Sequence, residues 1–290
     1  MSLHGPDAIR ARRRGGVVLA LAACRLACGV CLASPLASLL GESGVGARAE
    51  GDRLLFEGGG YLLLEVARLQ GPALLAAARG LLPLLTLGLL LTALGNAVLL
   101  VALSEPEERR ARALLSDALA RLPTLLFIGV LAGLAQAALL LFASLAADAV
   151  PSPPTRPVAS SAGVLGVWLA AALVAGAVGG AADVAKASSV RARAGVAAAL
   201  EHARRACFTR PLSALLGWLP YALLMIGSVA AAAAVTGWLD VSAPGAWRVA
   251  AVFIVHQLVV VGSVMLRAGW YARALRLVTS VPRPGLSATG

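Results

Sequence analysis

The sequence predicts an all-α polytopic transmembrane helical bundle with about six spans and amphipathic helices in the membrane interface. Two observations carry this prediction. Hydrophobic residues make up 59% of the 290 residues and charged residues only 13%, whereas a typical soluble domain is about 25% charged. The apolar residues also gather into runs of about 20, the length that crosses a bilayer as a helix. Lipid is therefore the expected solvent for most of the chain.

Six apolar runs are long enough to span, and they form a single transmembrane domain. The expected spans cover approximately residues 16–40, 81–103, 122–147, 162–182, 212–238 and 247–266. The run from Leu81 to Leu103 contains one Asn and no charge, and as a helix it would be about 34 Å long. Residues 41–80 are expected to form an extracytoplasmic loop with an amphipathic helix, and residues 267–290 a cytoplasmic tail.

The basic residues set the expected orientation. With the N-terminus inside, the inner segments hold 18 Lys and Arg and the outer segments hold 6. The cytoplasmic side of a membrane protein carries such an excess. Lysine occurs once, at Lys186, and this bias towards arginine is typical of a GC-rich bacterial genome. We expect a bacterial inner-membrane protein with both termini cytoplasmic.

The net charge of +11 is explained by these inner loops. Cationic loops face anionic lipid headgroups at the cytoplasmic leaflet, which are therefore the expected partners together with the bilayer itself. Membrane-protein partners are also compatible with such loops. Nucleic acid is not expected, because no basic domain lies outside the membrane segments.

The inner connections are expected to be helical. Ser104-Glu105-Pro106-Glu107 matches a capping box with proline in the first turn. The connection Lys186–Arg210 repeats the basic, amphipathic pattern. Both predict helices lying in the interface, with Pro123 and Pro211 marking the return into the membrane.

The status of the first span is open. Leu21-Ala22-Ala23-Cys24 fits the lipobox of bacterial lipoproteins, and a plain signal peptide cleaved near Ala33-Ser34 is a further alternative. Cys24, Cys28 and Cys31 share one helical face. A metal site would need a fourth ligand and polar surroundings, and cysteine is also an ordinary small apolar residue, so no metal or cofactor is expected.

Five polar side chains inside the expected spans form a candidate intramembrane site. They are Arg25, Asn96, Gln136, His256 and Gln257. Arg25 either snorkels to the headgroups, or pairs with an acid such as Asp183, or binds a lipid phosphate or substrate anion. The other four either hydrogen-bond neighbouring helices or hold a substrate. No acidic residue lies deep in an expected span, which disfavours a proton-coupled carrier.

Two glycine pairs and one outer segment complete the candidates. Gly129 with Gly133, and Gly176 with Gly180, have the spacing that permits close helix contact. In the outer loop, Glu57, Tyr61 and Glu65 flank three glycines. This second candidate site is either an extracytoplasmic partner or ligand site, or a capped turn before an interfacial helix.

The layout from Leu81 to Arg276, with basic inner helices and proline at each re-entry, resembles uncharacterised six-span bacterial integral membrane proteins. It is similar to the membrane domain attached to glycerophosphodiester phosphodiesterases. The sequence has no phosphodiesterase domain, so the resemblance implies a membrane fold and no activity.

No nucleotide-binding, metalloprotease or serine-hydrolase motif is present. The expected function is therefore a non-enzymatic scaffold or an accessory component of a membrane complex. The alternative is a transporter of a small solute or lipid, in which Asn96, Gln136 and His256 would line a water-accessible cavity. An intramembrane enzyme is the last alternative.

Overall fold

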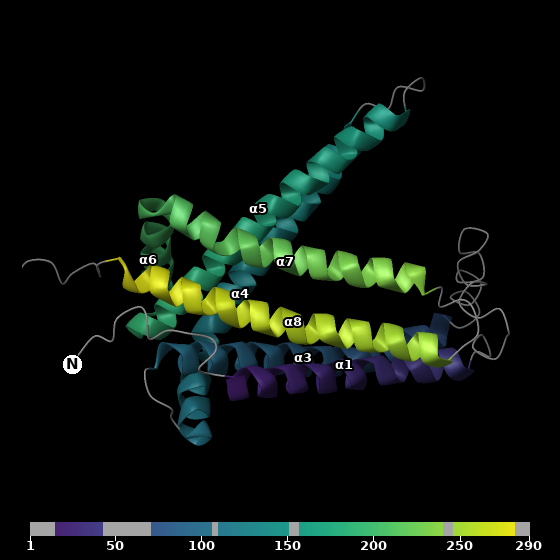
Figure 1. Ribbon diagram of the computed structural model, residues 1–290, viewed down its shortest axis with the longest axis horizontal. Helices are drawn as coiled ribbons and strands as arrows, with labels where there is room; N and C mark the ends of the chain where they lie inside the picture. The colour runs from purple at the N-terminus through teal and green to yellow at the C-terminus, as the bar shows by residue number, and fades with distance from the viewer. Residues whose placement is uncertain (1–14, 43–70, 106–109, 151–156, 240–245, 282–290) are drawn as a thin grey trace, which may run out of the picture. The chain divides into compact units, whose positions relative to one another are not determined.

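The computed structural model describes residues 15–42, 71–105, 110–150, 157–239 and 246–281. These residues form seven helices and no strand, which confirms the all-α prediction (Figure 1). The helices are α1 (Gly15–Glu42), α3 (Gly71–Ser104), α4 (Ala111–Asp148), α5 (Pro157–Ala192), α6 (Val196–Thr209), α7 (Pro211–Trp238) and α8 (Ala246–Thr279).

Five of these helices contain stretches long and apolar enough to cross a membrane. The stretches are Arg79–Ser104, Ala111–Asp148, Gly163–Ala192, Pro211–Trp238 and Ala250–Thr279. The chain is therefore a polytopic membrane protein. Helix α1 contributes a shorter apolar stretch, Gly15–Cys31, so a first span stays a prediction.

Two of the predicted helix boundaries were wrong. Ser104 does not begin a helix: it is the last residue of α3, and its hydroxyl donates to the Val101 carbonyl at 2.8 Å. Helix α4 begins at Ala111 and continues through Pro123 to Asp148 without a break. Proline removes one backbone hydrogen bond from a helix, and here a 38-residue helix absorbs that loss.

The described residues divide into two compact units, and three helices contribute one end to each. Unit 1 contains residues Ala97–Ala222 and, of the C-terminal residues, 268–281; unit 2 contains the described parts of Gly15–Asn96 and Leu223–Arg267. Helices α4, α5 and α6 lie wholly in unit 1, where α4 and α5 run side by side and α6 follows the end of α5 (Figure 1).

Unit 1 holds most of the close packing. Its fully buried side chains include Leu99, Ile128, Val184, Tyr271 and Leu275. Alanine is frequent among the buried residues of α5, α6 and α8, and small side chains let helix backbones approach closely. This packing fixes the places of the few charged groups described below.

Candidate functional site

Unit 1 contains an ion pair within α5, and a hydrogen bond from α8 reaches its carboxylate. Asp183 and Lys186 lie one turn apart on α5, with Lys186 Nζ 3.3 Å from Asp183 Oδ1. The indole Nε1 of Trp270 donates to the other carboxylate oxygen, Oδ2, at 3.2 Å. Asp183 is only 9% exposed. Both carboxylate oxygens are thus engaged by protein, and a buried carboxylate is tolerated only when it is paired in this way.

This ion pair lies within a helix long enough to span. The fourth span was expected to end at residue 182, and Asp183 and Lys186 follow that point on the same continuous helix, towards its C-terminal end. Sequence reasoning named Asp183 only as a possible partner of Arg25 and did not predict its contacts with Lys186 and Trp270.

Glycines make room for the side chains around the pair. A Cβ on Gly129 of α4 would lie 4.0 Å from Lys186 Nζ, and nothing lies within 4 Å of one on Gly133. A Cβ on Gly180 would approach the Trp218 ring to 3.0 Å, and one on Gly269 would approach Tyr221 Cε1 to 2.7 Å. The predicted glycine pair on α5 thus receives an indole ring of α7.

Aromatic contacts continue from there to Trp270. The rings of Tyr221 and Trp270 have centroids 6.4 Å apart and are inclined by 49°, within the range of favourable tilted aromatic pairs. One ring of α7 packs on α5 and the next reaches α8. The indole that binds Asp183 is therefore packed against a ring of α7.

Basic side chains in unit 1 bind backbone carbonyls near the ends of neighbouring helices. Arg191 donates to the carbonyl of Ser104, the last residue of α3, at 3.3 Å. Arg121 of α4 donates to the carbonyl of Val190, near the end of α5. These last carbonyls have no partner within their own helix, and a cation there also complements the helix dipole.

At the C-terminal end of α8, a buried histidine binds a backbone carbonyl. His202 of α6 is 5% exposed, and its Nε2 lies 3.4 Å from the carbonyl of Val278, one residue before the end of α8. Because a carbonyl only accepts, Nε2 must carry the proton. Three helices of unit 1 therefore have a carbonyl near their C-terminus bound by a side chain from another helix or turn.

The predicted intramembrane residues are partly brought together. In unit 2, Arg25 Nη2 donates to Asn96 Oδ1 at 3.4 Å, which joins α1 to α3. In unit 1, Gln136 Nε2 donates to the Ala175 carbonyl at 2.9 Å, between α4 and α5. Both contacts lie in helix seams, where intramembrane polar groups usually hydrogen-bond.

The remaining predicted residues have no shared site in the described part of the chain. His256 is exposed and its Nδ1 donates to the carbonyl of Val252 on its own helix, at 2.9 Å. Gln257 is half-buried beside it. Glu57, Tyr61 and Glu65 lie outside the described residues.

The described residues hold no group of three or more His, Cys, Asp or Glu that could bind a metal ion. Their four cysteines are free thiols, and burial raises the pKa of Cys207 in α6. A raised pKa leaves less of the reactive thiolate. The interactions that the described part of unit 1 displays are ion pairs within α5 and α6 and hydrogen bonds between helices.

Comparisons of the chain with protein-family models, with curated proteins and with solved structures give no match.

Proposed function

We propose that this membrane protein is a non-enzymatic scaffold or accessory component of a complex in a bacterial cytoplasmic membrane. The observation that carries the proposal is that several buried and half-buried polar side chains of unit 1 form hydrogen bonds or ion pairs with other protein groups. Both oxygens of Asp183 take donors from protein, and Gln136, Arg191 and His202 reach backbone carbonyls of neighbouring helices. Groups used in this way stabilise a rigid helix assembly.

The proposed orientation has both termini in the cytoplasm. The excess of basic residues in the inner segments, 18 against 6, supports it. The same count supports anionic lipid headgroups as partners at the inner face. The similarity to membrane domains of glycerophosphodiester phosphodiesterases remains a prediction from layout.

Co-purification from native membranes tests the scaffold proposal. The full chain carries an affinity tag and is compared with a deletion of Asp52–Arg79 and with the double variant Arg110→Ser, Arg112→Ser. Both arginines are exposed at the start of α4. We expect a stoichiometric membrane-protein partner that is lost in at least one variant. A chain that purifies alone, with neither change affecting any partner, would contradict the proposal.

A small-solute or lipid transporter is the second candidate. The observation that favours it is the presence of two opposite charges, Asp183 and Lys186, within a spanning helix, since intramembrane charges often mark substrate pathways. A transporter function requires water or substrate to reach that pair. Uptake of solute by proteoliposomes, abolished in Asp183→Asn, would favour the transporter over the scaffold.

A further inference from the structure

Helix α6 presents an exposed face opposite its packed face. Ala199, His202, Ala203 and Ala206 are buried. At 3.6 residues per turn, the opposite face centres on Glu201, Arg204 and Phe208, and Phe208 is 77% exposed. This face therefore combines charged side chains with a large ring.

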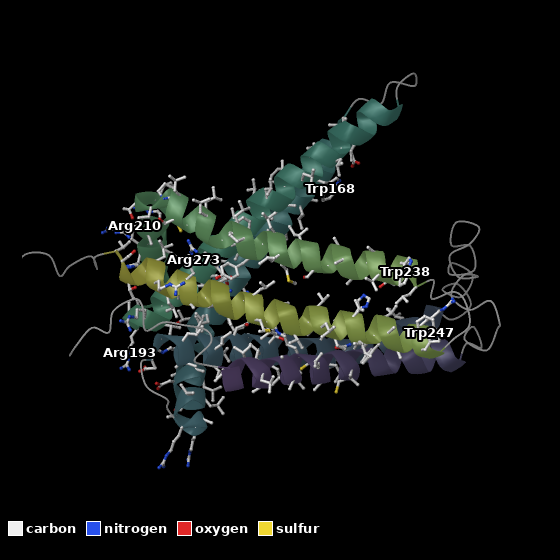
Figure 2. All side chains as sticks on the ribbon, viewed as in Figure 1. Trp168, Arg193, Arg210, Trp238, Trp247 and Arg273 are labelled. Atoms are coloured by element: carbon white, nitrogen blue, oxygen red, sulfur yellow. The ribbon has the colours of Figure 1, made fainter. Side chains whose placement is uncertain are left out.

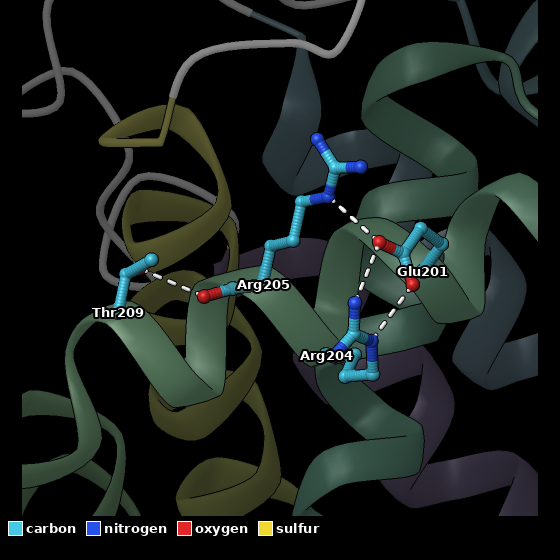
Figure 3. A network of polar contacts seen from close by, with 4 residues as sticks. All are labelled: Glu201, Arg204, Arg205 and Thr209. Carbon is cyan, nitrogen blue, oxygen red and sulfur yellow. Dashed lines mark hydrogen bonds and ion pairs between the residues drawn. The ribbon is translucent and has the colours of Figure 1, made fainter.

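Figure 3 shows the ion network on this face. Arg204 donates from Nε to Glu201 Oε2 at 2.8 Å and from Nη2 to Oε1 at 2.9 Å, and Arg205 donates from Nε to Oε1 at 2.7 Å. These bonds lower the pKa of Glu201 to about 2. The carboxylate thus stays ionised at neutral pH and balances one of the two arginines.

A net positive charge remains on this face. The guanidinium end of Arg205 points away from Glu201 (Figure 3), and Arg210 adds another exposed cation at the end of the helix. Two guanidinium groups are therefore placed to donate to an anion from outside the protein. Guanidinium forks match phosphate well.

The chain continues directly from this face into a spanning helix. Only Arg210 separates the end of α6 from Pro211, where α7 begins. Leu212 at the start of α7 is 70% exposed, and Leu215 and Leu216 are also exposed. The apolar surface that starts at Phe208 is thus continuous along the chain with leucines of a membrane-spanning helix.

A bilayer surface fits this face better than a soluble partner does. It offers acyl chains to the exposed apolar groups and phosphates to the arginines at the same depth, as for interfacial amphipathic helices. A soluble partner would have to cover leucines that belong to a span.

We propose that α6 lies on the membrane surface, with Phe208 and Leu212 among the acyl chains and Arg205 and Arg210 binding phosphate groups of anionic phospholipids. This inference rests on the proposed orientation, which places α6 at the anionic cytoplasmic leaflet. It adds a defined lipid site to the scaffold.

Electron spin resonance of reconstituted full-length protein tests the site. Spin-labelled phosphatidylglycerol and phosphatidylcholine are compared for their association with the protein at low ionic strength. We expect a preference for phosphatidylglycerol of about fivefold or more, because one basic residue at an anionic surface contributes about that factor. The preference should be several-fold weaker in Arg205→Gln, Arg210→Gln.

The matched control removes the same charge elsewhere. Arg79→Gln, Arg248→Gln alters two arginines of unit 2 and should keep the preference. No preference in the wild type, or equal loss in both double variants, would overturn the inference. Replacing chloride with inorganic phosphate at constant ionic strength should change nothing. A loss caused by phosphate alone would assign the arginines to free phosphate and reject the lipid site.

A second measurement locates Phe208. In a variant without the four native cysteines, a fluorophore on Phe208→Cys should be quenched by phospholipids carrying a nitroxide near the headgroup. Quenching by aqueous iodide instead would reject the membrane position of α6. These outcomes are separate from the scaffold test: a partner complex with no lipid preference rejects only the site, and a lipid preference without a partner rejects only the scaffold.

Discussion

The two units differ in which side chains they bury and which they expose. The buried polar residues Asp183, Ser188, Ser189 and His202 all belong to unit 1. Among the described residues of unit 2, the buried apolar side chains are Leu21, Ala22, Ala232 and Val264. Unit 2 instead exposes many large apolar side chains, including Leu82, Leu89 and Leu258.

This difference indicates which interactions hold the helices of this membrane protein together. An exposed leucine costs nothing in lipid, so apolar surface alone does not hold helices together in a bilayer. Small residues and hydrogen bonds between helices do, and the described part of unit 1 shows more of both. Figure 2 shows Arg193, Arg210 and Arg273 of this unit gathered at one end of its helices.

Unit 2 has aromatic residues at a helix end instead. Trp238 ends α7 and Trp247 lies at the start of α8, and both are largely exposed (Figure 2). Arg248 Cζ lies 5.5 Å from the centre of the Trp247 ring. Exposed tryptophans at helix ends are typical of the membrane–water interface, so we expect this end of unit 2 to lie at a membrane surface.

The largest effect is expected from breaking the ion pair of unit 1. Asp183→Leu leaves Lys186 without its carboxylate, and removing one member of a buried pair typically costs about 3–5 kcal/mol. Unfolding in detergent with increasing dodecyl sulfate measures this loss. His256→Leu in unit 2 is the control and should change the unfolding free energy by less than about 0.5 kcal/mol.

The double variant Asp183→Leu, Lys186→Leu sharpens this prediction. It should recover most of the lost stability, because two apolar groups leave no charge unpaired. If the double variant is as unstable as Asp183→Leu alone, the loss comes from packing and the ion pair is not its cause.

The next largest loss of stability is expected from substitution in one of the two predicted glycine pairs. The two pairs should differ in their sensitivity. Gly180→Leu forces a side chain against Trp218, and such overpacking costs about 1–3 kcal/mol. Gly133→Leu meets open space and should be neutral. The same unfolding titration compares them. Equal stability of the two variants would show that the seam between α5 and α7 is not closely packed.

A smaller loss is expected in the seam between α1 and α3 of unit 2. A Cβ on Gly95 would collide with Leu21, so Gly95→Val should cost about 1–2 kcal/mol. Gly80→Val, which meets nothing within 4 Å, is the control. If α1 is removed by cleavage, Gly95→Val will behave like the control, and this outcome would also show that the first span is not retained.

The smallest effect belongs to an intramembrane hydrogen bond. Gln136→Leu removes the bond to the Ala175 carbonyl, and such bonds contribute about 0.6 kcal/mol on average. Gln257→Leu in unit 2 should show no loss. A larger loss for Gln257 than for Gln136 would reverse the contrast between the units.

The sequence predicts the helical class and most of the spanning helices because apolar run length depends on composition alone. It does not predict Asp183 with Trp270, or Arg191 with Ser104. Each of these pairs is separated by 87 residues and depends on how helices pack. The pairing of Arg25 with Asn96 had no local signal either, although both residues were identified as intramembrane polar groups.

The roles of side chains at the helix ends were also not predictable from the sequence. Ser104 has the residues of a capping box after it, yet its hydroxyl binds back to α3. The excess of arginine in the expected inner segments was interpreted as a signal for orientation and for contact with anionic lipid. Arg121 and Arg191 also bind carbonyls near helix ends, a role that only the fold reveals.

The most direct test of a closed, rigid unit 1 is the reactivity of Lys186. It is the single lysine of the chain, so an amine-reactive reagent followed by mass spectrometry of its peptide reports on one site. The side chain is 18% exposed and paired with Asp183. We expect little labelling in the native protein and full labelling after unfolding. Rapid labelling of Lys186 in native membranes would show that water reaches the ion pair, and would contradict the scaffold in favour of a transporter.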